Sequence, residues 1–81
     1  MTTPPPEHLC NCWVVLGPDN RKVTCGIYRT SNAFELRMSY TDNEILGRQL
    51  FPRTPDVIER LTDAAELWRV NLVAKRFRDT R

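Results

Sequence analysis

The pattern of apolar and polar positions along the chain changes once, near Phe51 and Pro52. Before this point, short stretches of alternating apolar and polar residues are separated by turn-forming clusters at residues 17–20, 31–32 and 41–44. Beyond it, apolar residues recur at helical spacing. This pattern predicts an α+β fold in which a three- to four-stranded antiparallel β-meander packs on one long C-terminal helix.

The turns at residues 17–20 and 31–32 also predict the register of the first three strands. The first turn places Val14 opposite Val23, and the second places Ile27 opposite Leu36, so that each pair shares a face of the sheet. The predicted inner face comprises Cys10, Cys12, Val14, Leu16, Val23, Cys25, Ile27, Phe34, Leu36, Met38 and Tyr40. The predicted outer face comprises Asn11, Trp13, Val15, Lys22, Thr24, Gly26, Tyr28, Thr30, Glu35, Arg37 and Ser39.

A fourth strand is predicted at residues 44–51, but its register stays open. Simple alternation places Ile45 and Phe51 inside and leaves Leu46 and Leu50 outside. Gly47 is a position where a bulge could switch the alternation midway.

The predicted helix follows Thr54, a suitable N-cap, with Pro55 in the first helical position. Acidic residues dominate its first half and basic residues its last half, which complements the helix dipole. One apolar stripe is expected to cover the cysteine-bearing face of the sheet: Ile58, Leu61, Ala65, Trp68 and Leu72.

A second apolar row lies on the opposite side of the same helix, in its C-terminal half: Leu67, Val70, Val73, Ala74 and Phe77. A domain of this size has no further element to cover it, and an exposed apolar row of this kind marks an interface. We therefore expect a homodimer formed through these residues. The alternative is a helix that breaks near Asn71 and folds its last turns back onto the sheet.

The predicted outer sheet face gathers aromatic and basic side chains: Trp13, Lys22, Tyr28 and Arg37, with Arg48 nearby. Proteins that bind single-stranded nucleic acids combine these residue types, because bases stack on aromatic rings while cations hold phosphates. The same residues also serve as ordinary cross-strand pairs or could be covered in a sheet-to-sheet dimer. Single-stranded nucleic-acid binding is therefore the alternative function.

Length, charge and composition narrow the class of protein further. The chain of 81 residues with a net charge of +2 fits one domain at residues 8–78, preceded by a disordered proline-rich tail (1–7) and followed by a basic end (79–81). No apolar run is long enough to span a membrane, and the start "MTTPPPEHL" lacks the features of a signal peptide, so a cytoplasmic protein without a membrane partner is expected.

The stretch "HLCNCW" and Cys25 are the candidate reactive groups. Zinc needs four tetrahedral ligands, a geometry that Cys10 and Cys12 on one strand with His8 in the tail match poorly. A disulfide between Cys12 and Cys25 fits the predicted register, but the cytoplasm disfavours it, so buried free thiols are expected. Without a partnered nucleophile or a glycine-rich phosphate loop, the sequence predicts no enzyme, no cofactor and no metal site.

Four antiparallel strands followed by one helix, over about residues 9–77, resemble in topology the whirly-type transcriptional coactivator domains, which dimerise and bind single-stranded DNA. The dense Lys/Arg strands of those domains are missing here. The ending "AAELWRVNLVAKRF" is similar to the last helix of short uncharacterised bacterial proteins with a hairpin-rich sheet. Together with the residue patterns, these resemblances make a non-enzymatic interaction module the leading expected function.

Overall fold

In a computed structural model of the protein, residues 5–79 are described. The predicted tail and the predicted basic end lie partly outside this range, at residues 1–4 and 80–81. The elements are β1 (Glu7–Leu16), β2 (Lys22–Arg29), β3 (Ala33–Tyr40), β4 (Ile45–Pro52), α1 (Val57–Ala74) and β5 (Arg78–Asp79).

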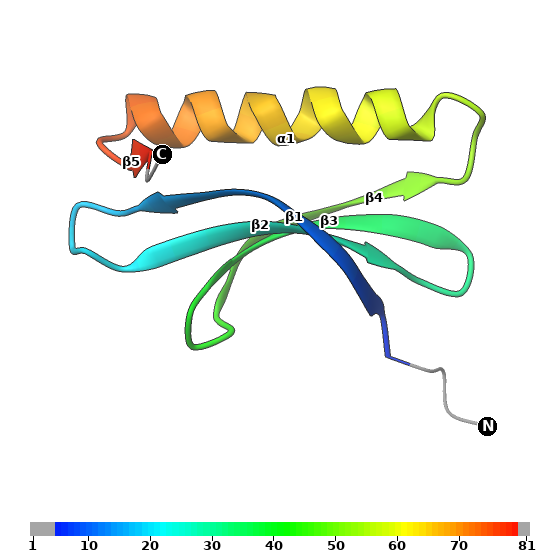
Figure 1. Cartoon of the computed structure of the whole chain (residues 1–81), viewed down its shortest axis with the longest axis horizontal. Coiled ribbons are helices and arrows are strands. Elements are labelled where there is room, and N and C mark those ends of the chain that lie inside the picture. Colours follow the sequence, from blue (N-terminus) through cyan, green and yellow to red (C-terminus); the bar gives the residue numbers. More distant parts are fainter. Residues whose placement is uncertain (1–4, 80–81) are drawn as a thin grey trace.

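The strands form one antiparallel sheet in the order β4-β3-β2-β1-β5, and α1 packs along one face of it (Figure 1). The predicted α+β meander with a C-terminal helix is therefore confirmed. The short strand β5, which pairs with the end of β1, was not predicted. Over the described residues, no helix is both long and apolar enough to cross a membrane.

The predicted register between β2 and β3 is confirmed. Cys25 lies opposite Met38, and Ile27 lies opposite Leu36. Cys25, Leu36 and Met38 are fully buried beneath α1. This hairpin therefore forms the centre of the core, as its alternating pattern indicates.

The predicted register between β1 and β2 is wrong by one residue over residues 13–16 of β1. Val15, not Val14, lies opposite Val23, because the connecting loop has five residues, 17–21, instead of four. Asn20 adopts a left-handed conformation (φ 63°), and the Gly17 amide donates a hydrogen bond of 2.8 Å to the Arg21 carbonyl. A one-residue slip moves every side chain to the other face, so Val15 is buried and Val14 is not.

Two irregularities in β1 shift its pairing with β2 again, on the N-terminal side of Trp13. The pairing with β2 shifts between His8 and Cys10 and again between Asn11 and Trp13. Trp13 itself keeps the register that the five-residue loop sets, so it lies opposite Cys25 and enters the core, where it is only 6% exposed. Cys10 is exposed. Placing Trp13 on the outer face was therefore wrong. Beyond the second irregularity Cys10 lies opposite Ile27, on the predicted face, but its predicted burial in the core is wrong.

The structure also settles the register of β4. Phe51 lies opposite Phe34 and is buried, whereas an irregularity beside Gly47 leaves Leu46 without a partner in β3. Beyond this point Ile45 is exposed. A change of parity next to Gly47 therefore leaves Phe51 as the inward apolar anchor of this strand.

Helix α1 begins at Val57, with Asp56 in the cap position that the sequence assigned to Thr54. Its buried side chains are Val57, Leu61, Ala65 and Leu72. Ile58, predicted in this stripe, is 67% exposed. The buried stripe follows i, i+4 spacing from Val57 through Leu61 to Ala65, and this turns Ile58 to solvent.

The helix continues through Asn71 and ends at Ala74, so the predicted alternative of a break near Asn71 is wrong. Arg76 then adopts φ 70°, and the Phe77 amide donates to the Leu72 carbonyl at 3.0 Å. Together with the bond from the Arg76 amide to the Val73 carbonyl, this is a Schellman motif. It turns Phe77 back against the core, where it is half-buried.

Candidate functional site

The C-terminal half of α1 carries an exposed apolar surface on the side away from the sheet. We call it the back face and define it by Leu67, Val70, Val73 and Ala74. The first three side chains are 62%, 50% and 41% exposed, respectively. Phe77, the fifth residue predicted here, packs against the core instead. The back face is therefore one residue smaller than the sequence indicated.

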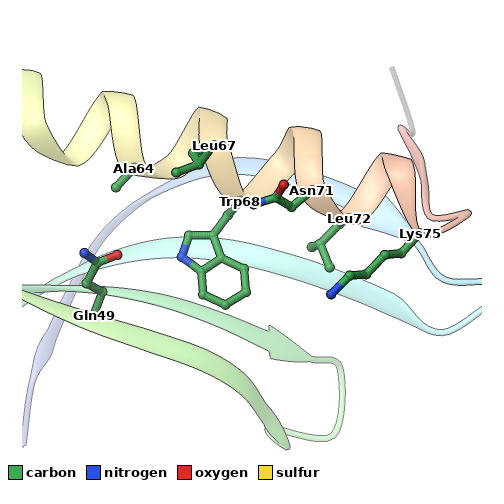
Figure 2. A pocket seen from close by; sticks show the side chains of 7 residues that line it. All are labelled: Gln49, Ala64, Leu67, Trp68, Asn71, Leu72 and Lys75. Atoms are coloured by element: carbon green, nitrogen blue, oxygen red, sulfur yellow. The ribbon is translucent and has the colours of Figure 1, made fainter.

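A groove of about 590 Å³ opens beside this surface, between α1 and β4. Figure 2 shows the Trp68 indole standing in it, with Gln49 at one end and Lys75 at the other. The residues lining the groove are Gln49, Ala64, Leu67, Trp68, Asn71, Leu72 and Lys75.

The floor of the groove is formed by a tight contact between Trp68 and Gly47. A Cβ atom built on Gly47 would come within 2.7 Å of Trp68 Cη2, closer than real side chains approach. The absence of a side chain on Gly47 therefore lets the indole lie directly on β4. Helical spacing did predict that Trp68 faces the sheet, but it gave no sign of a groove.

The polar side chains of the groove have no protein partner among the residues that the structure describes. Over residues 5–79, Lys75 forms no ion pair, and the side-chain amides of Gln49 and Asn71 form no hydrogen bond. None of the lining residues is acidic. The groove thus combines an apolar floor with one cation and two neutral hydrogen-bonding amides.

The outer sheet face holds four of the five residues predicted for nucleic-acid contact. Tyr28 and Arg37 come together, since the Arg37 guanidinium lies 4.2 Å from the centre of the Tyr28 ring. Arg48 lies opposite Arg37 on the neighbouring strand, whereas Lys22 lies at the opposite end of β2 from Tyr28. Trp13, the fifth residue, points into the core on the other face.

Glu35 is a charged residue on this face for which the sequence analysis predicted no role. Only 4% of its side chain is exposed, and its carboxylate lies 2.6 Å from Arg37 and 3.5 Å from Arg48. A buried carboxylate is stable only when it is paired, which explains why both arginines turn toward it. One negative charge therefore offsets part of the positive charge of the outer face.

Trp13 has a structural role. Its indole N–H donates a hydrogen bond of 2.8 Å to the Ala65 carbonyl of α1. This bond joins the first strand to the helix across 52 residues of sequence. An exposed stacking surface for a nucleic-acid base is thereby lost.

Cys10, Cys12 and Cys25 are free thiols. Burial raises the pKa of both Cys12 and Cys25 above the ordinary value of a thiol, and the two side chains share a hydrogen bond. Both therefore remain protonated at neutral pH, which makes them poor nucleophiles. In the part of the chain that is described, no three His, Cys, Asp or Glu side chains are placed to hold a metal ion.

Comparison of the chain with models of protein families, with curated proteins and with solved structures gives no significant match.

Proposed function

We propose that the protein is a non-enzymatic interaction module that forms a homodimer through the back face of α1. The observation that carries the proposal is the exposed row of Leu67, Val70 and Val73. Figure 1 shows α1 as an outer layer with the sheet on one side only, so no described element covers this row. We place the module in the cytoplasm, where free thiols such as those of its cysteines persist.

A second copy of the chain fits the back face better than an unrelated partner, because the charges flanking it are self-complementary. Asp63 and Arg76 are exposed, and neither forms an ion pair within residues 5–79. If two helices pair antiparallel about Val70, each Asp63 comes close to the partner's Arg76. The same arrangement sets Leu67 beside Val73, as a two-fold interface requires.

The size of the surface bounds the strength of this dimer. A helix of 18 residues is about 27 Å long. A stable interface buries about 800 Å² on each partner, more than a single helical row supplies. We therefore expect a reversible dimer whose population rises with protein concentration.

Sedimentation velocity over a concentration series tests the proposal. The wild type should shift from monomer to dimer, and Val70→Asp should keep it monomeric because it places a charge at the centre of the interface. Ile58→Asp is the matched control, since Ile58 is an exposed apolar residue of the same helix outside the back face. A wild type that stays monomeric at every concentration would refute the homodimer.

Charge exchange provides a second, more specific test. Asp63→Arg should weaken the dimer, because it sets two cations side by side in the antiparallel pair. Adding Arg76→Asp should restore it. If the double variant is as weak as the single variant, the antiparallel pairing is wrong.

Single-stranded nucleic-acid binding by the outer sheet face is the second candidate, favoured by the cluster of Tyr28, Arg37 and Arg48. We rank it lower, because Glu35 neutralises part of the charge and Arg37 already covers the Tyr28 ring. Fluorescence titration of a labelled oligonucleotide at low salt tests it. Binding that is lost in Arg37→Ala and Arg48→Ala would support this function, and no binding by the wild type would dismiss it.

A further inference from the structure

The groove between α1 and β4 exists because of two unusual residues on the inward side of β4. Gly47 lies opposite Met38, and Gln49 lies opposite Leu36. Met38 and Leu36 are fully buried, so both positions of β4 face the helix side of the sheet. A sheet that packs on a helix favours large apolar side chains there. Instead, the Trp68 indole fills the space above Gly47, and Gln49 brings an amide into the groove where an apolar side chain would be usual.

The lining of the groove is suited to a molecule with one negative charge and an apolar body. Trp68, Leu72 and Ala64 provide apolar contact, while the Lys75 ammonium turns into the groove from the end of α1 (Figure 2). Among the described lining residues, no acidic side chain competes for Lys75. Known sites for small molecules have this combination of an apolar wall and a few unpaired polar groups, in volumes of about 300–1,000 Å³.

We infer that this groove binds a small carboxylate with an apolar tail, the tail lying along Trp68 and Leu72 and the carboxylate on Lys75. A single cation with two neutral amides matches a monoanion. A phosphate ester carries more charge and favours a site with several cations. Because Gly47 lets Trp68 rest on β4, the floor is already formed before the ligand arrives.

This inference does not rest on the homodimer. Of the back face, Leu67 also lines the groove, but Val70, the centre of the back face, does not. The residues assigned to the ligand, Trp68, Leu72 and Lys75, lie outside the back face. The titration is therefore run on the wild type and on Val70→Asp. Equal affinity in the two proteins separates the ligand site from dimer formation, whichever way the dimer test falls.

Two-dimensional ¹H–¹⁵N NMR provides the assay, because the two indole N–H signals report on different places. Titration with octanoate should shift the Trp68 indole signal to saturation. The signal of Trp13, which is buried and hydrogen-bonded to Ala65, is the internal control. Octan-1-ol and octylammonium are the matched probes, the first without a charge and the second with the opposite one. Both should bind more weakly than octanoate.

Variants of Lys75 test the role of the cation. Lys75→Gln should weaken octanoate binding about fivefold, the upper range for a solvent-exposed ion pair, and should leave octan-1-ol binding unchanged. Lys75→Arg should restore it. Arg76→Gln, a change in the neighbouring cation that does not line the groove, should have no effect. The inference is overturned if octanoate does not shift the Trp68 signal, or if octan-1-ol binds as tightly as octanoate.

Discussion

Replacing Trp13 by phenylalanine is the sharpest test of the fold, because the two possible registers of β1 predict opposite outcomes. In the structure, Trp13 is buried opposite Cys25, and its indole N–H is bonded to the Ala65 carbonyl. If the loop between β1 and β2 had only four residues, the same side chain would lie on the open face of the sheet. The change to phenylalanine would then have little consequence for stability.

The expected loss of stability is the sum of two contributions. Loss of the hydrogen bond to the Ala65 carbonyl costs about 1 kcal/mol. Loss of the buried atoms of the larger ring, with incomplete closure of the space they leave, costs a further ~1–2 kcal/mol. Trp13→Phe should therefore lower the free energy of unfolding by about 2–3 kcal/mol. For a domain of this size, each kcal/mol lowers the melting temperature by roughly 4–8 °C.

Urea unfolding followed by circular dichroism measures this difference, with Ile58→Ala as the control. Ile58 is exposed, so its replacement should change the free energy of unfolding by no more than about 0.5 kcal/mol. Hydrogen exchange adds a second readout, in which the Trp13 indole N–H should exchange more slowly than that of Trp68. A loss below about 0.5 kcal/mol for Trp13→Phe, which is typical of surface positions, would refute the register of β1.

Three further changes test separate parts of the fold by urea unfolding. Gly47→Ala should lower the free energy of unfolding by about 1–3 kcal/mol, because the new Cβ would lie 2.7 Å from Trp68 Cη2; an unchanged stability would contradict this contact. Arg76→Gly should raise it by about 0.5–1 kcal/mol by relieving the left-handed conformation, φ 70°, at the end of α1. The third concerns alkaline pH. Burial raises the pKa of Cys25 above 9.0, so the unfolded chain releases the thiol proton at a lower pH than the folded protein does. The contribution of the buried thiol to the free energy of unfolding is therefore fully present below pH 9.0 and is lost as the pH rises above it. The decline between pH 7 and pH 10 should be smaller in Cys25→Ala, and equal declines would contradict a raised pKa.

The architecture could be predicted from the sequence, because it follows from the length and period of the apolar segments. The register of β1 could not, since it depends on whether the loop includes Arg21. Asn20 contained a usable signal: a type I turn followed by asparagine in the left-handed region makes a longer loop. The two irregularities beside Cys10 and Trp13 have no comparable signal in the sequence, because no glycine of β1 marks either position.

The candidate sites show a similar division. Helical spacing alone identified the back face, because Leu67, Val70 and Val73 share one side of any regular helix. It did not reveal that Phe77 leaves this face, since the Schellman turn uses arginine at a position where glycine is usual. The groove was missed because it depends on how Trp68 rests on Gly47 and on the open space beside that contact, and a pattern of apolar residues does not record empty space.

A single helix packed on one sheet leaves two broad surfaces open to solvent, the outer face of the sheet and the outer side of the helix, and their side chains differ. On the outer face of the sheet, Glu35 pairs with Arg37 and Arg48, so a polar network covers the surface. The first half of α1 is similarly polar on its outer side, where Glu59 and Asp63 are exposed. On the back face, by contrast, Leu67, Val70 and Val73 form an exposed apolar row along the helix. A domain this small is only marginally stable, so an apolar row left in solvent is better explained as an interface than as a surface without a function.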